Sequence, residues 1–200
     1  MKQPSLSSAS VRRITYIGIL TALVFVLQLL GGAIRFGAFS VSLVLLPIVL
    51  GAAIGGPLAG GWLGFVFSMA VFITGDANAF FVIHPFGTIL TVVLKGTLAG
   101  LVAGLVYRLL EHRNRDLSAI TAAVVCPIVN TGVFLLGCML FFLPTLREWG
   151  AAEGFESVWG YLLIGFVGLN FIFELIVNLV LAPVLLRLLS MFEQHCQPRT

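Results

Sequence analysis

The chain has 200 residues, of which 60% are hydrophobic and 10% are charged, and its formal net charge at pH 7 is +3. Soluble globular proteins contain about 25% charged residues, so this composition excludes a water-soluble catalytic domain. A bilayer is spanned by about 20 apolar residues in one helix, and the apolar residues suffice for roughly six such helices. We therefore expect an all-α integral membrane protein with six transmembrane helices.

The predicted organisation is a cytoplasmic tail at 1–13, a transmembrane substrate-binding domain at 14–190 and a second cytoplasmic tail at 191–200. In chain order, the predicted spans are 14–34, Val41–Ile54, Leu58–Thr74, 85–110, 117–143 and 159–190. Gly55-Gly56-Pro57 separates the second and third spans and indicates a tight turn. The longer connections are a loop at 75–84, a basic connector at 111–116 and an acidic loop at 144–158.

The basic residues predict the orientation of these spans. Eight Lys and Arg residues fall on one side of the predicted membrane, and only Arg35 and Arg147 fall on the other. Cytoplasmic loops carry the excess of Lys and Arg. Both termini are therefore predicted to be cytoplasmic in a multi-pass protein of a prokaryotic plasma membrane, with the loops at 35–40, 75–84 and 144–158 facing outward.

Polar side chains at membrane depth identify a candidate site. Lys95 and Glu174 lie near the middle of the fourth and sixth predicted spans, where charges are costly and usually functional. Lipid cannot satisfy buried amides and hydroxyls, so the polar residues of the last three spans are expected to face a shared interior. The candidate substrate-binding residues are Lys95, Asn130, Asn170, Glu174, Thr91 and His84.

Two alternatives stay open for these residues. Lys95 and Glu174 can form an ion pair that only holds two helices together. His84, just before Pro85 at the mouth of the fourth span, can be an interfacial hydrogen-bonding residue instead of a ligand-binding one. No second His is close enough in sequence to argue a metal site, and no hydrolase, metalloprotease or nucleotide-binding motif occurs. We therefore expect no enzyme activity, no metal and no cofactor in this chain.

Small residues at four-residue spacing predict close helix packing. They occur as Gly56, Gly60 and Gly64 around the third span and as Gly96, Gly100 and Gly104 in the fourth. Packing within one chain is the expected role of both sets. Gly18 and Ala22 in the first span have the same spacing.

Three segments resemble the substrate-binding S components of energy-coupling factor (ECF) vitamin transporters. They are IGILTAL at 17–23, LPIVLGAAIGGPLAGGWLG at 46–64 and KGTLAGLVAGLVY at 95–107. The resemblance extends over about 14–190 and includes the size, the six spans and the inside termini. It implies a subunit that captures a vitamin from outside and delivers it with a transmembrane coupling subunit and two cytoplasmic ATPases, which use ATP.

The resemblance also implies roles for particular residues. An AxxxA-like motif on the first helix of the family contacts the coupling subunit, and Gly18 and Ala22 occupy this pattern, with Gly in place of the first Ala. Lys95 would neutralise a substrate carboxylate, and Asn130 and Asn170 would bind amides or hydroxyls. Pantothenate or another anionic vitamin, such as folate or biotin, suits these groups. The expected partners are lipid, the vitamin and the ECF subunits, without nucleic acid; the alternative function is a self-sufficient secondary transporter.

Overall fold

The computed structural model describes residues 8–33, 35–36, 39–40 and 43–196, and these residues are almost entirely helical. The elements before the first long loop are α1 (Ser8–Ala33), β1 (Arg35–Phe36), β2 (Phe39–Ser40), α2 (Leu45–Gly55) and α3 (Pro57–Thr74). They are followed by α4 (Asn78–Ile83), α5 (Pro85–Leu110), α6 (Arg115–Gly137), a π-helical segment (Cys138–Phe142) and α7 (Leu143–Ala152). The chain ends in α8 (Val158–Gly160), a second π-helical segment (Tyr161–Phe166) and α9 (Gly168–Cys196). The two short strands pair antiparallel, with Arg35 opposite Ser40.

The predicted class, an all-α membrane protein, agrees with the lengths and apolar composition of the helices. In the described residues, five helical segments are long and apolar enough to cross a membrane: Val11–Gly31, Pro57–Thr74, Pro85–Leu110, Arg115–Ala152 and Val158–Phe192. The remaining apolar helix, α2, has 11 residues and is therefore about 17 Å long, whereas the hydrocarbon core is about 30 Å thick. The count of six spans and the orientation of the termini stay predictions, and the predicted start of the second span near Val41 lies outside the described residues.

Several predicted boundaries are wrong. The acidic segment 144–158 is not one loop, because α7 continues the helical chain to Ala152 and only a short connection precedes α8. Pro144 is tolerated there since it lies in the first turn of α7, where a backbone N–H has no helical partner in any case. Helix α4 lies within the predicted loop 75–84. Helices α1 and α9 extend to Ser8 and Cys196, but a helix can continue past the bilayer, so the two cytoplasmic tails stay predictions.

The glycines of α3 and α5 bring these two helices into direct backbone contact. A methyl group at Gly60 would collide with the Gly100 carbonyl, and one at Gly64 would collide with the Gly96 carbonyl. A Cβ at Gly104 would lie 2.6 Å from the Cα of Pro57. The predicted packing role within one chain is therefore confirmed for both sets of glycines.

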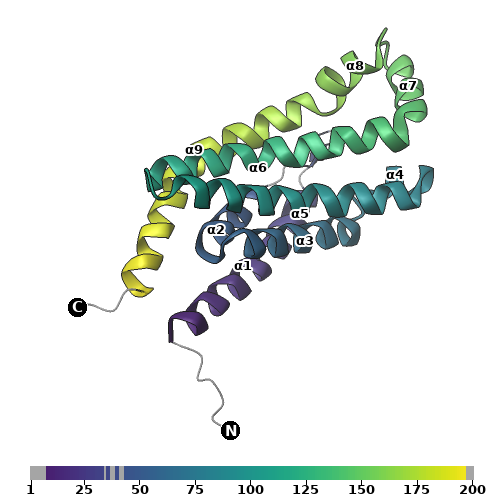
Figure 1. The fold of residues 1–200 in the computed structure, drawn as a ribbon. Coiled ribbons are helices and arrows are strands. Elements are labelled where there is room, and N and C mark those ends of the chain that lie inside the picture. Colours follow the sequence, from purple (N-terminus) through teal and green to yellow (C-terminus); the bar gives the residue numbers. More distant parts are fainter. Residues whose placement is uncertain (1–7, 34, 37–38, 41–42, 197–200) are drawn as a thin grey trace.

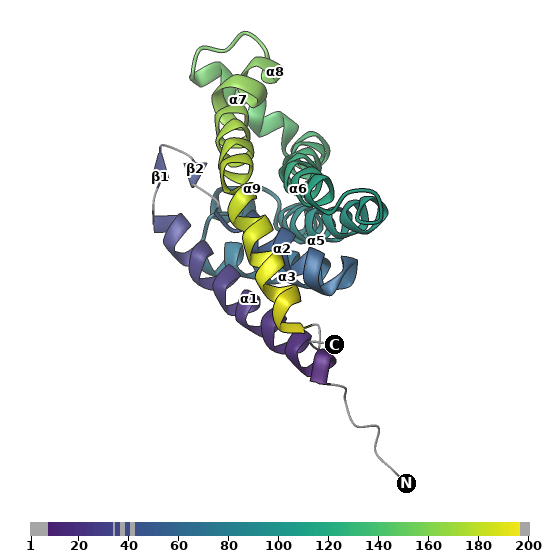
Figure 2. The same cartoon turned by 90° about the vertical axis from the view of Figure 1, so that its left-hand side faces the viewer.

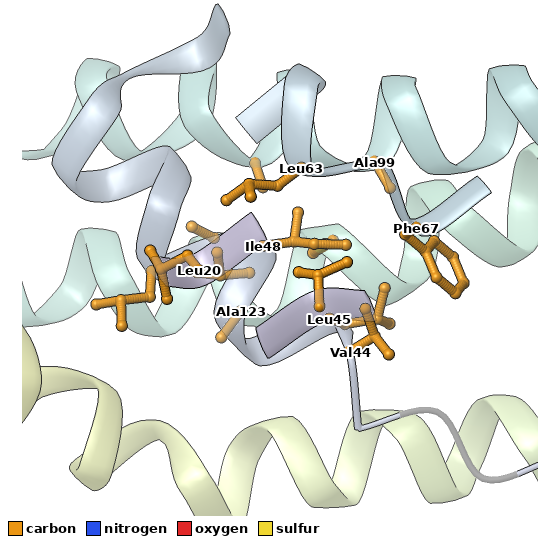
Figure 3. Close-up of a cluster of buried hydrophobic side chains, with 14 of the residues drawn as sticks. Leu20, Val44, Leu45, Ile48, Leu63, Phe67, Ala99 and Ala123 are labelled. Atoms are coloured by element: carbon orange, nitrogen blue, oxygen red, sulfur yellow. The ribbon is translucent and has the colours of Figure 1, made fainter. Parts of the chain in front are cut away.

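Helix α2 fills the middle of the bundle. It contacts α1, α3, α5, α6 and α9, and most of its residues are buried. Figure 3 shows Leu45 and Ile48 of α2 among Leu20, Leu63 and Ala123 of the surrounding helices. This enclosed position explains how so short a helix is stabilised, because its apolar surface is covered on all sides by protein.

The molecule has two distinct ends. The start of α1 and the end of α9 lie at one end, and α4, α7 and α8 lie at the other (Figure 1). Figure 2 shows α1 and α9 converging towards the first of these ends, where the rings of Tyr16 and Phe192 meet edge to face with centroids 4.8 Å apart. The end formed by α4, α7 and α8 is the one that the Lys and Arg distribution predicts to face outward.

Candidate functional site

A cavity of about 140 Å³ lies between the long helices. It extends from Lys95 and Glu174, in the interior of α5 and α9, to Asp76 and Phe80 near the end formed by α4, α7 and α8. Polar lining residues come from five parts of the chain: Gln28 of α1, Asp76 after α3, Thr88, Thr91 and Lys95 of α5, Asn130 and Thr131 of α6, and Asn170 and Glu174 of α9. The other eight lining residues are apolar, and four of them are Phe, a composition typical of small-molecule sites.

The Lys95 ammonium group lies between two aromatic rings. Its Nζ is 5.6 Å from the ring centroid of Phe67 on α3 and 5.1 Å from that of Phe134 on α6. Such cation–π contacts stabilise a cation without neutralising its charge. No carboxylate oxygen of the described residues lies within 4.0 Å of this nitrogen, so the protein supplies Lys95 with no direct counter-ion there.

Glu174 is buried, and only one of its two carboxylate oxygens accepts a hydrogen bond of full geometry. Its Oε1 accepts a hydrogen bond from Nδ2 of Asn170, one helical turn earlier, at 3.3 Å. Its Oε2 is buried without a hydrogen bond of full geometry in the described part of the chain, although the Asn130 side chain also interacts with the carboxylate. Glu174 and Asp76 both interact electrostatically with Lys95, so the structure brings these charges to one cavity without joining Lys95 and Glu174 in an ion pair.

Two further unpartnered oxygens lie at the same cavity. Asn130 is 5% exposed and Thr91 is 3% exposed, and neither Oδ1 of Asn130 nor Oγ1 of Thr91 has a hydrogen-bond partner among the described residues. Gly137 of α6 allows the close approach of α5 at this level, because a Cβ at Gly137 would collide with the Thr91 side chain. Five of the six candidate residues from the sequence, Lys95, Asn130, Asn170, Glu174 and Thr91, therefore line one cavity.

The sixth candidate, His84, lies outside the cavity. Its side chain is exposed, and its Nδ1 accepts a hydrogen bond from the backbone N–H of Gly87 at 2.9 Å, which caps the start of α5. Its ring lies 5.4 Å from that of Phe141. The geometry agrees with the alternative interpretation of an interfacial hydrogen-bonding residue.

Gln28 and Asp76 belong to the cavity and were not among the candidates. Gln28 is 3% exposed, and its Nε2 donates a hydrogen bond to Oδ2 of Asp76 at 2.7 Å. Thr74 donates a second hydrogen bond to the same oxygen at 3.1 Å. The sequence signal for Gln28 was its amide in an otherwise apolar span, which needs a partner in the same way as Asn130.

The two candidate coupling residues lie on an open face of α1. Gly18 and Ala22 are both exposed, and a Cβ at Gly18 would meet no atom within 4 Å. Unlike the glycines of α3 and α5, Gly18 is therefore not used to pack this chain against itself.

A bundle of long apolar helices around a cavity with deep polar groups defines a membrane protein that binds a small solute. Residues 12–186 match the family model described as "ECF transporter, substrate-specific component". The chain belongs to this family, and it is a multi-pass cell-membrane protein of the substrate-specific class. No curated protein and no solved structure matches the chain at a significant level.

Proposed function

We propose that this chain captures a vitamin or a related micronutrient from outside the cell and delivers it inward with an ECF coupling subunit and two cytoplasmic ATPases. In this proposal the chain catalyses no reaction and carries no cofactor, and the partner ATPases use ATP. The observation that carries the proposal is the cavity in which Lys95, Asn130 and Glu174 converge from three helices.

The charge of Lys95 supports an anionic substrate such as pantothenate, folate or biotin. A buried ammonium group that makes no direct ion pair favours a ligand whose anionic group can contact it. The aromatic rings of Phe67 and Phe134, which flank Lys95, add apolar surface for the rest of such a molecule.

The open face of α1 supports an interaction with the coupling subunit. Small residues at four-residue spacing allow another helix to approach closely. Gly18 and Ala22 have this spacing and are exposed, whereas the other small-residue stripes are already occupied within the chain.

Co-purification and uptake together test the proposal. The tagged chain, expressed with the ECF coupling subunit and ATPases of the same cell, is expected to purify with all three, and uptake of its substrate is expected to require them. The alternative, a self-sufficient secondary transporter, requires uptake that persists when the coupling subunit and the ATPases are deleted.

A further inference from the structure

We propose that the substrate carries two different polar groups. One is an anionic group that pairs with Lys95, and the other is an amino group, or an amino-substituted ring, whose N–H groups donate hydrogen bonds to Glu174 and Asn130. This inference rests on the proposed function, because it specifies what the cavity of this S component binds. It narrows the proposed substrate class from anionic vitamins in general to anions that also carry an amino group.

The anionic group follows from the surroundings of Lys95. An ammonium group has three hydrogen-bond donors, and those of Lys95 face two aromatic rings and the cavity. A ligand that fills the cavity displaces the water around this charge. A carboxylate or phosphate group on the ligand restores a partner for the ammonium in a charge-assisted bond.

The N–H donors follow from Glu174 and Asn130. Glu174 Oε2 and Asn130 Oδ1 are both acceptors on side chains more than nine-tenths buried, and neither oxygen has a hydrogen bond of full geometry in the described residues. The Asn130 side chain also interacts with the Glu174 carboxylate, so one ligand group can reach both residues. A carboxylate and an amide oxygen without donors are complementary to a group with at least two N–H bonds. Since Asn170 already donates to Glu174 Oε1, the second carboxylate oxygen is the one left for the ligand.

A substrate with an anionic group but no N–H donors would satisfy only one part of this site. Its negative group would satisfy Lys95, but its remaining atoms would displace water from Glu174 and Asn130 without replacing the lost donors. A site whose buried polar groups are left unpaired discriminates strongly against such a ligand. The same reasoning excludes a cation without an acidic group, which would leave Lys95 unpaired.

The test is a binding panel on the purified full-length chain in detergent. Folate and pyridoxamine 5′-phosphate carry both groups. Pantothenate and pyridoxal 5′-phosphate carry an acidic group without an amino group, and thiamine carries an amino-substituted ring without an acid. We expect an amino-bearing anion to bind, and its affinity to fall about 30-fold or more in both Lys95→Met and Glu174→Gln. Thr97→Val on α5 and Asn178→Ala on α9 are matched controls outside the cavity lining and are expected to keep wild-type affinity.

Two results would overturn the inference. One is tight binding of pantothenate or pyridoxal 5′-phosphate that Lys95→Met weakens and Glu174→Gln leaves unchanged. This result keeps the proposed function and removes only the amino group from the inferred substrate. The other result comes from the wild-type chain alone and so does not depend on the folding of any variant. It is the identification, by mass spectrometry of retained small molecules, of a substrate without an amino group or without an acidic group. A failure of the proposed function is distinguished by co-purification, because the chain would then not purify with the coupling subunit and the ATPases.

Discussion

Gln28 on α1 donates a 2.7 Å hydrogen bond to Asp76 in the connection between α3 and α4, and both residues line the cavity. The same helix carries Gly18 and Ala22 on its open face. The proposed substrate site and the proposed coupling surface are therefore connected through one helix, and this hydrogen bond is a polar contact between α1 and the segment after α3.

We expect Gln28→Leu to loosen this connection. A hydrogen bond to a charged group contributes about 1.5–3 kcal/mol, so the variant should lose affinity for the substrate or stability of the fold by an amount in this range. A double-mutant cycle with Asp76→Asn, read by thermal unfolding and by substrate titration, measures the pair directly. A coupling energy of zero in both measurements would show that the hydrogen bond does not hold α1 in place.

A large side chain on the open face of α1 should separate transport from binding. Gly18→Leu and Ala22→Leu add bulk where close helix approach is proposed, but neither residue lines the cavity. Uptake by cells is expected to fall strongly while substrate binding to the purified chain is retained. Leu109→Trp, on an exposed position of α5, is the control for bulk on the membrane-facing surface. Equal loss of binding and uptake would indicate a folding defect.

Substitution of two glycines in α3 should have different effects on stability. Gly64→Ala places a methyl group against the Gly96 carbonyl, whereas the nearest atom to a Cβ at Gly61 lies 3.6 Å away. Forcing extra atoms into a packed contact costs about 1–3 kcal/mol, so Gly64→Ala should lower the melting temperature in detergent and Gly61→Ala should not. Equal melting temperatures for the two variants would contradict the close α3–α5 contact.

The relation between Lys95 and Glu174 is decided by a double variant. Because no direct ion pair joins them, Lys95→Met is expected to keep the fold and to weaken substrate affinity by about 2–5 kcal/mol. Lys95→Met/Glu174→Leu should then not recover this affinity. Unfolding temperature and isothermal titration of all three proteins are the measurements. An unstable single variant, a stable double variant and normal affinity together would assign both charges a purely structural role.

The orientation of the chain is testable by cysteine labelling in intact cells. His112→Cys and Glu153→Cys lie at opposite ends of the molecule, in the α5–α6 and α7–α8 connections. The Lys and Arg distribution predicts that only Glu153→Cys reacts with an impermeant thiol reagent added outside. Reaction at both positions from outside, or at His112→Cys alone, would contradict cytoplasmic termini.

The sequence by itself determined the membrane class, the positions of the long apolar helices and the family. It also identified five of the nine polar residues that line the cavity, for a local reason: a bilayer offers no partner to a side chain such as Lys95, Asn130 or Glu174, so each must face the interior of the protein. The close packing of α3 and α5 was likewise predictable from their glycines, because close helix contact requires small residues at a fixed spacing.

Only the tertiary structure decided how these elements fit together. The short helix α2 is stable because five other helices cover it, and no local pattern encodes that enclosure. The contact of Gln28 with Asp76 joins residues 48 positions apart, and His84 lies outside the cavity because it caps the helix that carries Lys95. Lys95 and Glu174 reach the same cavity but stay unpaired, since the separation of α5 and α9 is set by the packing of the whole bundle and not by either helix alone.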